Sequence, residues 1–421
     1  MKPLHFVLTT ATAATLLFAS CSNKDKTPTP EPGVNPVDTA LSGSVSGTWT
    51  KNGTYHVTGD IIIPEGKSLT IEAGAKVIFD ANTKPEFLVK GNLYAVGTDA
   101  APIQFTVEDN KKAAFGMNWG GIMGGPTCGE IILDHCIIEQ GGNATTEGSA
   151  SVAAGFYKAA AGNRVPVLWY GNPSGKLVVT HCTIRNFGED GFYIEGGNVI
   201  VDHNMIYTTG VDNGDAINIK SGVHADVAFN TIFSPNTNAL KLSNSGDRAV
   251  TAYVYGYNNT IINCGWRRAT TKGGSIWVEK GVIVELYNNL LVNDRFGIKR
   301  DKTNTENTAS KFGHTLYFGY NQTTVTQFQP SDEIIAGAND VISAAVGAND
   351  PKFVNFPLST DMASATFNTA WDFHIQAGSP AQNHGKTDFN SHFMTNAISF
   401  GNGASYKSPA AGSYIGAWDV K

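Results

Sequence analysis

Two lysines, Lys220 and Lys241, are candidates for a general base, because of their side-chain type and their spacing in the sequence. They lie 21 positions apart, and each sits in a short alternation of apolar and polar residues that is typical of a strand. A second ammonium group nearby disfavours the charged form of a lysine and so lowers its pKa. A lysine with a lowered pKa is suited to remove a proton at neutral pH. We therefore expect Lys220, with Lys241 beside it, to carry any catalytic chemistry.

The lysines belong to a set of five short strands that repeat along the chain. Because side chains alternate across a strand, each strand points apolar residues inward and a second set outward. The outward residues form one solvated strip: Tyr193, Glu195, Asn218, Lys220, Lys241, Ser243, Trp277, Glu279, Gly297 and Lys299. Four more residues can reach the strip from flanking turns: Trp266, Arg267, Arg268 and Arg300.

The strip predicts a groove for an acidic polysaccharide. Aromatic rings pack on the apolar faces of sugars, and Lys and Arg pair with the carboxylates of uronate units. An ordinary solvated sheet face, with Lys and Glu in cross-strand pairs, would have a similar composition. Two tryptophans expected on one exposed face, Trp266 and Trp277, favour the groove.

The stretch Asp215-Ala-Ile-Asn-Ile-Lys-Ser resembles the acidic-x-x-x-x-Lys-Ser run of the β-helix alginate and chondroitin B lyases. The resemblance implies that turn acids bind Ca²⁺ against a uronate carboxylate and that a lysine removes the C5 proton this acidifies. On this mapping Asn213, Asp215 and Asp190 are Ca²⁺ ligands, and Lys220 is the base. The next repeat departs from the pattern, because Lys241-Leu-Ser-Asn stands where the lyases have Arg-His-Gly.

A polygalacturonase-like hydrolase is a second catalytic interpretation. Such an enzyme needs two acids that flank the glycosidic bond, and Asp190 and Asp215 stack in adjacent repeats. However, Ala216 stands where a second acid of an Asp-Asp pair would be, and a Gly-His-Gly turn is missing. Two interpretations without catalysis also remain open, a glycan-binding surface lipoprotein and a structural or adhesive solenoid.

A second repeat, of one small polar residue before a β-branched pair, predicts the fold. The first residues of seven such runs lie 46, 22, 26, 29, 30 and 32 positions apart, which indicates a stacked solenoid. Coils would stack about 4.8 Å apart, and each Asn would bond to the Asn above and below. The predicted ladder positions are Cys136, Cys182, Asn204, Asn230, Asn259, Asn289 and Asn321. Three histidines repeat with them and are expected to be turn residues: His135, His181 and His203.

The composition and two further stretches agree with an all-β chain. Of the 421 residues 41% are apolar and 16% charged, and the net charge of −6 argues against a nucleic-acid partner. Residues 60–80 and 87–106, followed by Asn118-Trp-Gly-Gly-Ile, resemble the first coils of right-handed parallel β-helix repeat proteins of the pectate-lyase-like superfamily. The resemblance implies a single-stranded right-handed parallel β-helix over 44–330 and a C-terminal cap over 331–421. It leaves the activity open, since many activities occur on one fold.

The N-terminal residues predict a lipoprotein signal peptide. Residues 1–21 combine Lys2, an apolar stretch and a small-residue exit onto Cys21, which resembles a bacterial lipobox. The charged and then Pro-rich residues 22–43 resemble the export tag and tether of surface lipoproteins of Bacteroidetes. No second apolar run approaches the roughly 20 residues needed to span a bilayer. We expect a monomeric, outward-facing outer-membrane lipoprotein, held by its lipid alone.

Four further cysteines carry no metal-binding spacing. Cys128, Cys136, Cys182 and Cys264 form no Cys-x-x-Cys pair, which argues against a structural zinc site. Cys136 and Cys182 fall at ladder positions of neighbouring coils. We expect them to be stacked buried thiols, with a disulfide as the alternative.

Overall fold

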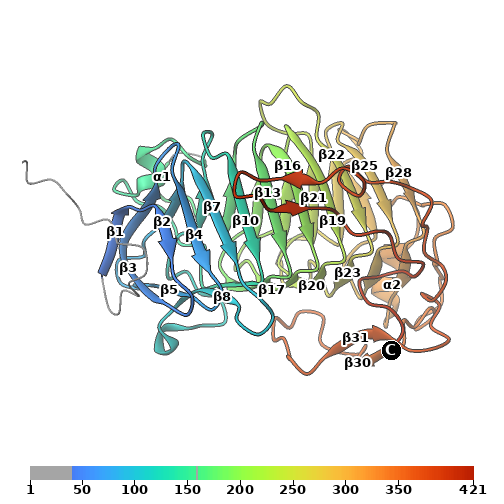
Figure 1. Ribbon diagram of the computed structural model, residues 1–421. Helices are drawn as coiled ribbons and strands as arrows, with labels where there is room; N and C mark the ends of the chain where they lie inside the picture. Colours follow the sequence, from blue (N-terminus) through green and yellow to red (C-terminus); the bar gives the residue numbers. More distant parts are fainter. Residues whose placement is uncertain (1–39, 158–159) are drawn as a thin grey trace, which may run out of the picture.

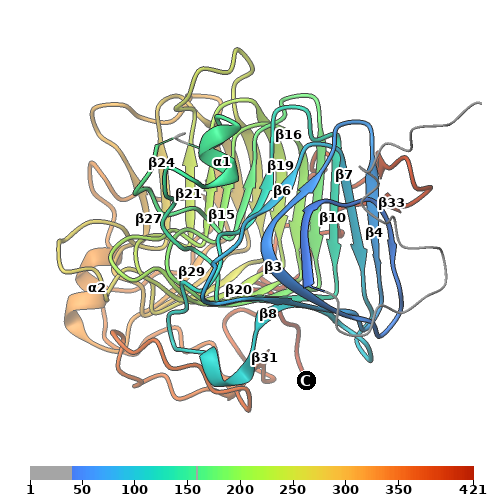
Figure 2. The ribbon, with the colours of Figure 1, turned by 90° about the vertical axis from the view of Figure 1, so that its left-hand side faces the viewer.

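The computed structural model describes residues 40–157 and 160–421, and these form a parallel β-solenoid of about ten turns (Figure 1). Viewed along its axis, the coil has three faces around an apolar core (Figure 2). Residues 1–39, with Cys21, the lipobox and most of the tether, lie outside the described residues. In the described part no helix is long and apolar enough to cross a membrane.

Face 1 is a column of short strands that will carry the candidate site. Its strands are β6 (Phe87–Val89), β9 (Ile122–Gly124), β12 (Leu168–Tyr170), β15 (Phe192–Ile194), β18 (Ile217–Ile219), β21 (Leu240–Ser243), β24 (Ile276–Glu279) and β27 (Ile298–Arg300). Each pairs in parallel with the strand one coil away.

Face 2 is the ten-stranded sheet in the foreground of Figure 1. Its strands are β2 (Gly47–Trp49), β4 (Ser68–Glu72), β7 (Asn92–Val96), β10 (Glu130–Asp134), β13 (Lys176–Thr180), β16 (Gly197–Asp202), β19 (Val223–Ala228), β22 (Tyr253–Tyr257), β25 (Ile283–Tyr287) and β28 (Lys311–Gly313).

Face 3 is a second column in the same large sheet as face 1. Its strands are β5 (Lys76–Phe79), β8 (Ile103–Val107), β11 (Cys136–Glu139), β14 (Thr183–Phe187), β17 (Met205–Thr209), β20 (Thr231–Pro235), β23 (Thr260–Ile262), β26 (Leu290–Val292) and β29 (Leu316–Phe318). The long strand β3 (Thr54–Ile63), which pairs with β1 (Ala40–Ser44), β5 and β6, joins faces 1 and 3. The solenoid is therefore established, while its right-handed sense stays a prediction.

An asparagine ladder runs through the buried turn between faces 2 and 3. Asn204, Asn230 and Asn259 each donate from Nδ2 to the Oδ1 of the next ladder asparagine at 3.0 Å. The last acceptor in this series is Asn289. The two preceding positions hold Cys136 and Cys182 as buried free thiols. Such bonds satisfy polar groups that water cannot reach.

The seventh predicted ladder position is wrong. Leu290 of β26 pairs with Leu316 of β29, so Thr315 occupies the position after Asn289. Asn321 instead caps α2 (Gln322–Phe328), where its side chain accepts from the backbone N–H of Thr324 at 2.9 Å. An Asn is as well suited to a helix N-cap as to a solenoid turn, so its residue type alone did not separate the two.

The C-terminal segment closes the last coil and then returns along the outside. Ile335 enters the core, and Val341 bridges Leu316 at the last coil. The hairpin of β30 (Phe353–Asn355) and β31 (Asp372–Ile375) packs on face 3, and that of β32 (Ile398–Ser399) and β33 (Ser405–Tyr406) packs on face 2 (Figures 1 and 2). The predicted cap is thus also a strap over two faces. The middle of face 1 remains accessible, as the cavity described below shows.

Candidate functional site

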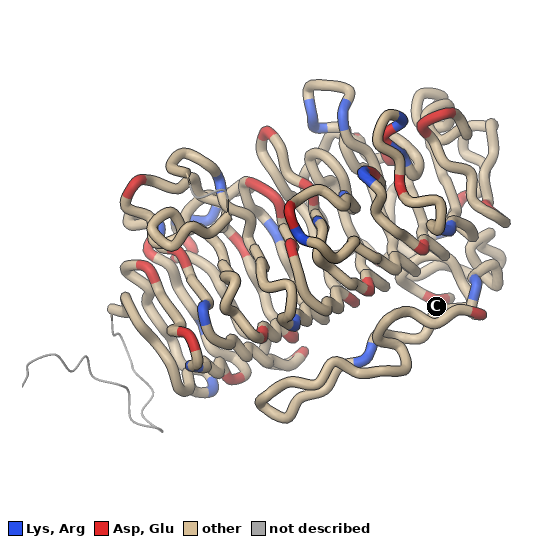
Figure 3. The backbone as a smooth tube through the Cα atoms, turned by 90° about the horizontal axis from the view of Figure 1, so that it is seen from above, with Lys and Arg blue, Asp and Glu red and all other residues tan. Residues whose placement is uncertain are grey.

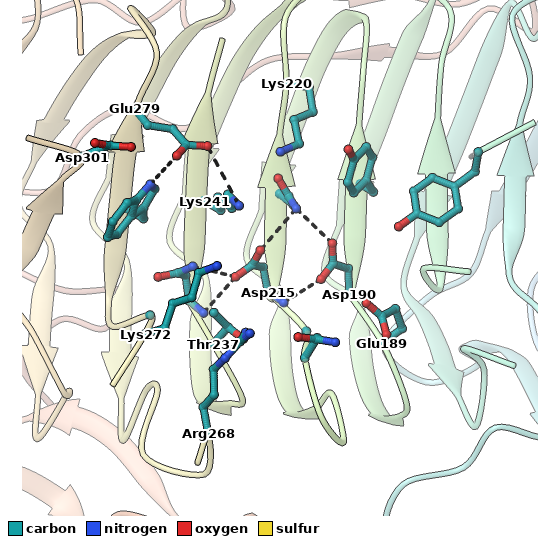
Figure 4. Close-up of a pocket in the computed structure, with 18 residues that line it drawn as sticks. Glu189, Asp190, Asp215, Lys220, Thr237, Lys241, Arg268, Lys272, Glu279 and Asp301 are labelled. Carbon is teal, nitrogen blue, oxygen red and sulfur yellow. Dashed lines mark hydrogen bonds and ion pairs between the residues drawn. The ribbon is translucent and has the colours of Figure 1, made fainter. Parts of the chain in front are cut away.

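A cavity of about 640 Å³ lies on face 1, over β15, β18, β21 and β24 and beside the turns that precede them (Figure 4). We call it the groove. Its floor is a row of outward-facing residues that the parallel pairing places side by side: Tyr193, Asn218, Lys241 and Trp277. The sequence predicted this row correctly, because one inward–outward alternation per strand sets which face each residue takes.

The register of the next strand differs from the prediction by two residues. Lys299, predicted to lie beside Glu279, pairs with Trp277, and Arg300 pairs with Val278. Asp294, which precedes this strand in the sequence, is fully buried, and it accepts from the backbone N–H of Cys264 at 2.8 Å.

A second polar ladder forms one side of the groove. Asp190, Asp215 and Asn238 each stand two residues before a face 1 strand, and each accepts the backbone N–H of the next coil through Oδ1, at 2.8, 3.0 and 3.0 Å. The sequence already contains this pattern, an acid or amide two residues before each of these face 1 strands. These carboxylates therefore have a structural role in addition to any chemical one.

Asn218 joins the two carboxylates of this ladder. Its Nδ2 donates to Asp190 Oδ2 at 3.0 Å and to Asp215 Oδ2 at 3.2 Å (Figure 4). Burial, and after it the charges of Asp215 and Glu189, raise the pKa of Asp190 to about 7. Two buried acids this close disfavour each other's ionisation, so Asp190 holds a proton for part of the time at neutral pH.

Lys220 lies at the opposite side of the groove in a position that disfavours its charge. Its side chain is only 7% exposed, and its Nζ lies 5.2 Å from the centre of the Tyr193 ring. Burial, and after it the charge of Lys241, lower the pKa of Lys220 to about 8. This agrees with the direction expected from the sequence.

Lys241 and Glu279 form a loose ion pair across adjacent strands, with Nζ and Oε1 4.0 Å apart. Burial alone would raise the pKa of Glu279, but the hydrogen bond from Trp277 Nε1 at 2.9 Å and the charge of Lys241 outweigh it and lower that pKa. Glu279 is therefore a fixed anion paired with Lys241, and Lys220 has no ion-pair partner among the described residues.

Several residues predicted for the strip lie elsewhere. Arg267 reaches away from the groove and donates to the carbonyls of Thr209, Gly210 and Ser234, and Trp266 donates to the Asn293 carbonyl at 2.6 Å. A tight turn separates both side chains from the strand pattern, so alternation could not place them.

Three more residues predicted to bind substrate instead form contacts within the protein at the ends of the strip. Glu195 accepts from Trp169 Nε1 at 2.7 Å, Lys299 pairs with Glu333 at 3.1 Å, and Arg300 pairs with Glu306 at 2.5 Å. Of the turn cations, Arg268 does line the groove, where it donates to Thr237 at 2.7 Å.

Other lining residues were not predicted: Tyr157, Glu189, Thr237, Asn238, Lys272 and Asp301. Tyr157 comes from the inserted segment 143–165, whose path the strand periodicity does not specify. Lys272 and Asp301 lie in turns that the repeat pattern leaves undefined.

The predicted Ca²⁺ ligands are partly brought together. Asp190 and Asp215 share the Asn218 amide, and Asn213 lies at the rim of the groove. Oxygen donors are those that Ca²⁺ prefers, and the Oδ1 of Asn218 is buried without a hydrogen-bond partner. The donor set thus fits a hard cation if the amide turns its oxygen inward, and Ca²⁺ here stays a prediction.

A second group of potential ligands lies at a turn that borders face 2. Among the residues described, Asp134, His135 and His181 offer ligand atoms within 4.8 Å of one another. The rings of His135, His181 and His203 stack at 4.7 and 4.9 Å, and all three residues have a positive φ. Parallel stacked rings do not direct their lone pairs to one point, which agrees with the predicted role as turn residues.

Comparisons with known proteins do not assign the chain to a family: no family model, no curated protein and no solved structure matches it. By its fold the protein is a parallel β-solenoid with a buried asparagine ladder and a polar groove on one face.

Proposed function

We propose that the groove binds an acidic, uronate-containing polysaccharide and cleaves it by β-elimination, with Lys220 as the base. The observation that carries the proposal is the buried Lys220, whose lowered pKa suits proton removal, in a groove that also presents Lys241. Trp277 and Tyr193 provide ring faces for sugars at the two ends of the row.

Three of the lining cations are available to an anionic ligand. Lys220, Arg268 and Lys272 have no carboxylate at ion-pair distance among the described residues. The groove is also lined by five acids, of which Asp190, Asp215, Glu279 and Asp301 accept hydrogen bonds from the protein, and the fifth is Glu189. Uronate carboxylates would pair with the free cations. Figure 3, seen from above, shows Lys and Arg interspersed with Asp and Glu along the backbone.

In the proposed reaction, neutral Lys220 takes the C5 proton of a uronate unit. The electron pair of that C–H bond forms the C4–C5 double bond, and the bond from C4 to the glycosidic oxygen breaks. The leaving oxygen takes a proton, for which the Lys241 ammonium stands on the neighbouring strand. A Ca²⁺ ion held by Asp190, Asp215 and Asn213 would neutralise the uronate carboxylate and so acidify the C5 proton.

A hydrolase is the second candidate, because Asp190 carries a pKa of about 7 next to the carboxylate of Asp215. A protonated acid beside a charged one is the arrangement that glycoside hydrolysis uses. A glycan-binding protein without catalysis is the third. All three share the groove and differ in the product.

One experiment separates these candidates. The purified protein is incubated with alginate, pectate, and chondroitin and dermatan sulfates, with and without Ca²⁺. Elimination produces new reducing ends together with the ultraviolet absorbance of unsaturated uronates, whereas hydrolysis produces reducing ends alone. Binding by calorimetry without either signal indicates a glycan-binding protein. No binding to any of the four polymers would contradict the proposal.

We also propose that acylated Cys21 anchors the chain to the outer face of the outer membrane, with no other membrane contact. The lipobox-like run and the Pro-rich tether support this.

A further inference from the structure

We infer that the groove takes the end of a glycan chain or a short oligosaccharide, and that it does not hold the middle of a long polymer. This inference rests on the proposed function, because it concerns the substrate of the same groove. Its basis is that side chains end, on both sides, the row that runs across β15, β18, β21 and β24.

Two described residues of the inserted segment 143–165, Phe156 and Tyr157, close the first end. Phe156 and Tyr157 pack on Trp169 and Met123, the outward residues of β12 and β9, and bury both of them. The Tyr157 ring then meets the Tyr193 ring at 4.9 Å with an interplanar angle of 72°. A sugar chain that lies on Tyr193 therefore cannot continue along face 1 in this direction.

Hydrogen bonds fix this wall at both of its margins. The N–H and Oγ of Ser151, in α1 (Ala150–Ala153), donate to the buried Glu86 carboxylate at 2.8 and 2.6 Å. On the other margin, Arg164 pairs with Asp212 at 3.0 Å. A buried carboxylate that accepts two hydrogen bonds holds its partners firmly, so the insert is a built wall of the groove.

A second wall stands beyond Trp277. The Nζ of Lys299 lies 5.6 Å from the centre of the Trp277 ring and 3.1 Å from Glu333. The backbone of Lys299 also bridges Ile334, and the Arg300 N–H donates to the Glu333 carbonyl at 2.8 Å. The segment around Glu333 thus forms the next rung after β27, and the Lys299 side chain that Glu333 holds against Trp277 ends the row.

The space between the walls matches a small ligand. Four strands at a spacing of about 4.8 Å cover about 14 Å, and a volume of about 640 Å³ lies within the range of roughly 300–1,000 Å³ typical of small-molecule sites. This is room for a di- or trisaccharide, and a longer chain must leave over the rim with one terminus inside. An enzyme of this shape would release short products from chain ends.

Binding as a function of chain length tests the inference. The full chain is titrated with oligogalacturonates and chondroitin oligosaccharides of two, three, four and six units and with the parent polymers. We expect the affinity to rise up to three units and then to change by less than twofold, with one protein bound per polymer chain. An affinity that rises a further tenfold between three and six units, or several proteins per polymer chain, would overturn the inference while the proposed function stands. Absence of binding to every probe would overturn both.

Removal of either wall provides the matched variants. Tyr157→Ala and Lys299→Ala each open one end, and we expect either change to raise the affinity for six units relative to three by at least tenfold. Tyr320→Ala removes an exposed tyrosine outside the groove and should leave the length profile unchanged. Thermal unfolding of each variant shows whether it folds. An unchanged length profile in both folded wall variants would contradict the inference.

Discussion

Replacement of Lys220 by methionine should stabilise the protein while it removes the proposed base. Methionine has a similar length and no charge, so it can occupy the buried position. The pKa of Lys220 falls from 10.5 to about 8 on folding, and a difference of about 2.5 units corresponds to about 3 kcal/mol. We expect Lys220→Met to raise the free energy of unfolding by about this amount at pH 7.

The pH dependence follows from the sign of the shift. Below about pH 8 the lysine is protonated in both the folded and the unfolded protein, so the folded state carries the full cost of a buried charge. As the pH rises from about 8 towards 10.5 the unfolded state binds more protons than the folded state, and the cost disappears. The advantage of Lys220→Met should therefore be greatest at pH 7 and small near pH 10.5.

Urea unfolding of wild type and Lys220→Met, followed by tryptophan fluorescence at pH 7 and pH 10, measures this difference. Lys302→Met, at an exposed lysine outside the groove, is the matched control and should change stability by less than about 0.5 kcal/mol. A Lys220→Met variant that is no more stable than wild type at pH 7, or a difference that does not change with pH, would refute the reasoning.

Three further predictions concern the ladder, the turn arginines and the anchor. Asn230→Ala should destabilise by about 3 kcal/mol in chemical unfolding, because it leaves two buried backbone groups of the neighbouring coil, the Asn204 N–H and the Val201 carbonyl, without these partners, whereas a loss under 1 kcal/mol would argue against the ladder. Arg267→Ala should destabilise by a similar amount, because it removes charge-assisted hydrogen bonds to three carbonyl groups, and should leave glycan affinity unchanged. Arg268→Ala should lower glycan affinity about tenfold and leave the stability unchanged. If Arg267→Ala lowered glycan affinity and Arg268→Ala did not, the assignment of the groove as the glycan site would be contradicted. Cys21→Ala should shift the protein from the membrane to the soluble fraction of cells, and unchanged membrane association would contradict lipid anchoring.

The sequence predicted those parts of the fold that repeat. Asn204, Asn230 and Asn259 recur at one turn and do form the ladder, because each coil repeats the same buried hydrogen bond. Asn321 failed as a ladder position, since the polar residues Gln322 and Thr323 follow it, and an Asn before such residues is compatible with a helix N-cap.

The groove could be predicted only where it is built from strands. Asn218 and Lys241 were placed correctly, because strand alternation fixes their direction. Tyr157 and Arg267 could not be placed, because the direction of a side chain in an insert or a tight turn depends on tertiary contacts that no period encodes. The closure of the groove at its ends could not be predicted from the sequence for the same reason.

The pH dependence of elimination tests the central claim most directly. With a pKa of about 8, about a tenth of Lys220 is neutral at pH 7, about 300 times more than for a lysine at 10.5. On a polymer that binds, the account predicts a rise of unsaturated-uronate absorbance whose rate increases with pH up to an apparent pKa near 8. The rise should be absent in Lys220→Ala and retained in Lys302→Ala. No rise with alginate, pectate, chondroitin sulfate or dermatan sulfate, or a rise that survives Lys220→Ala, would contradict the account.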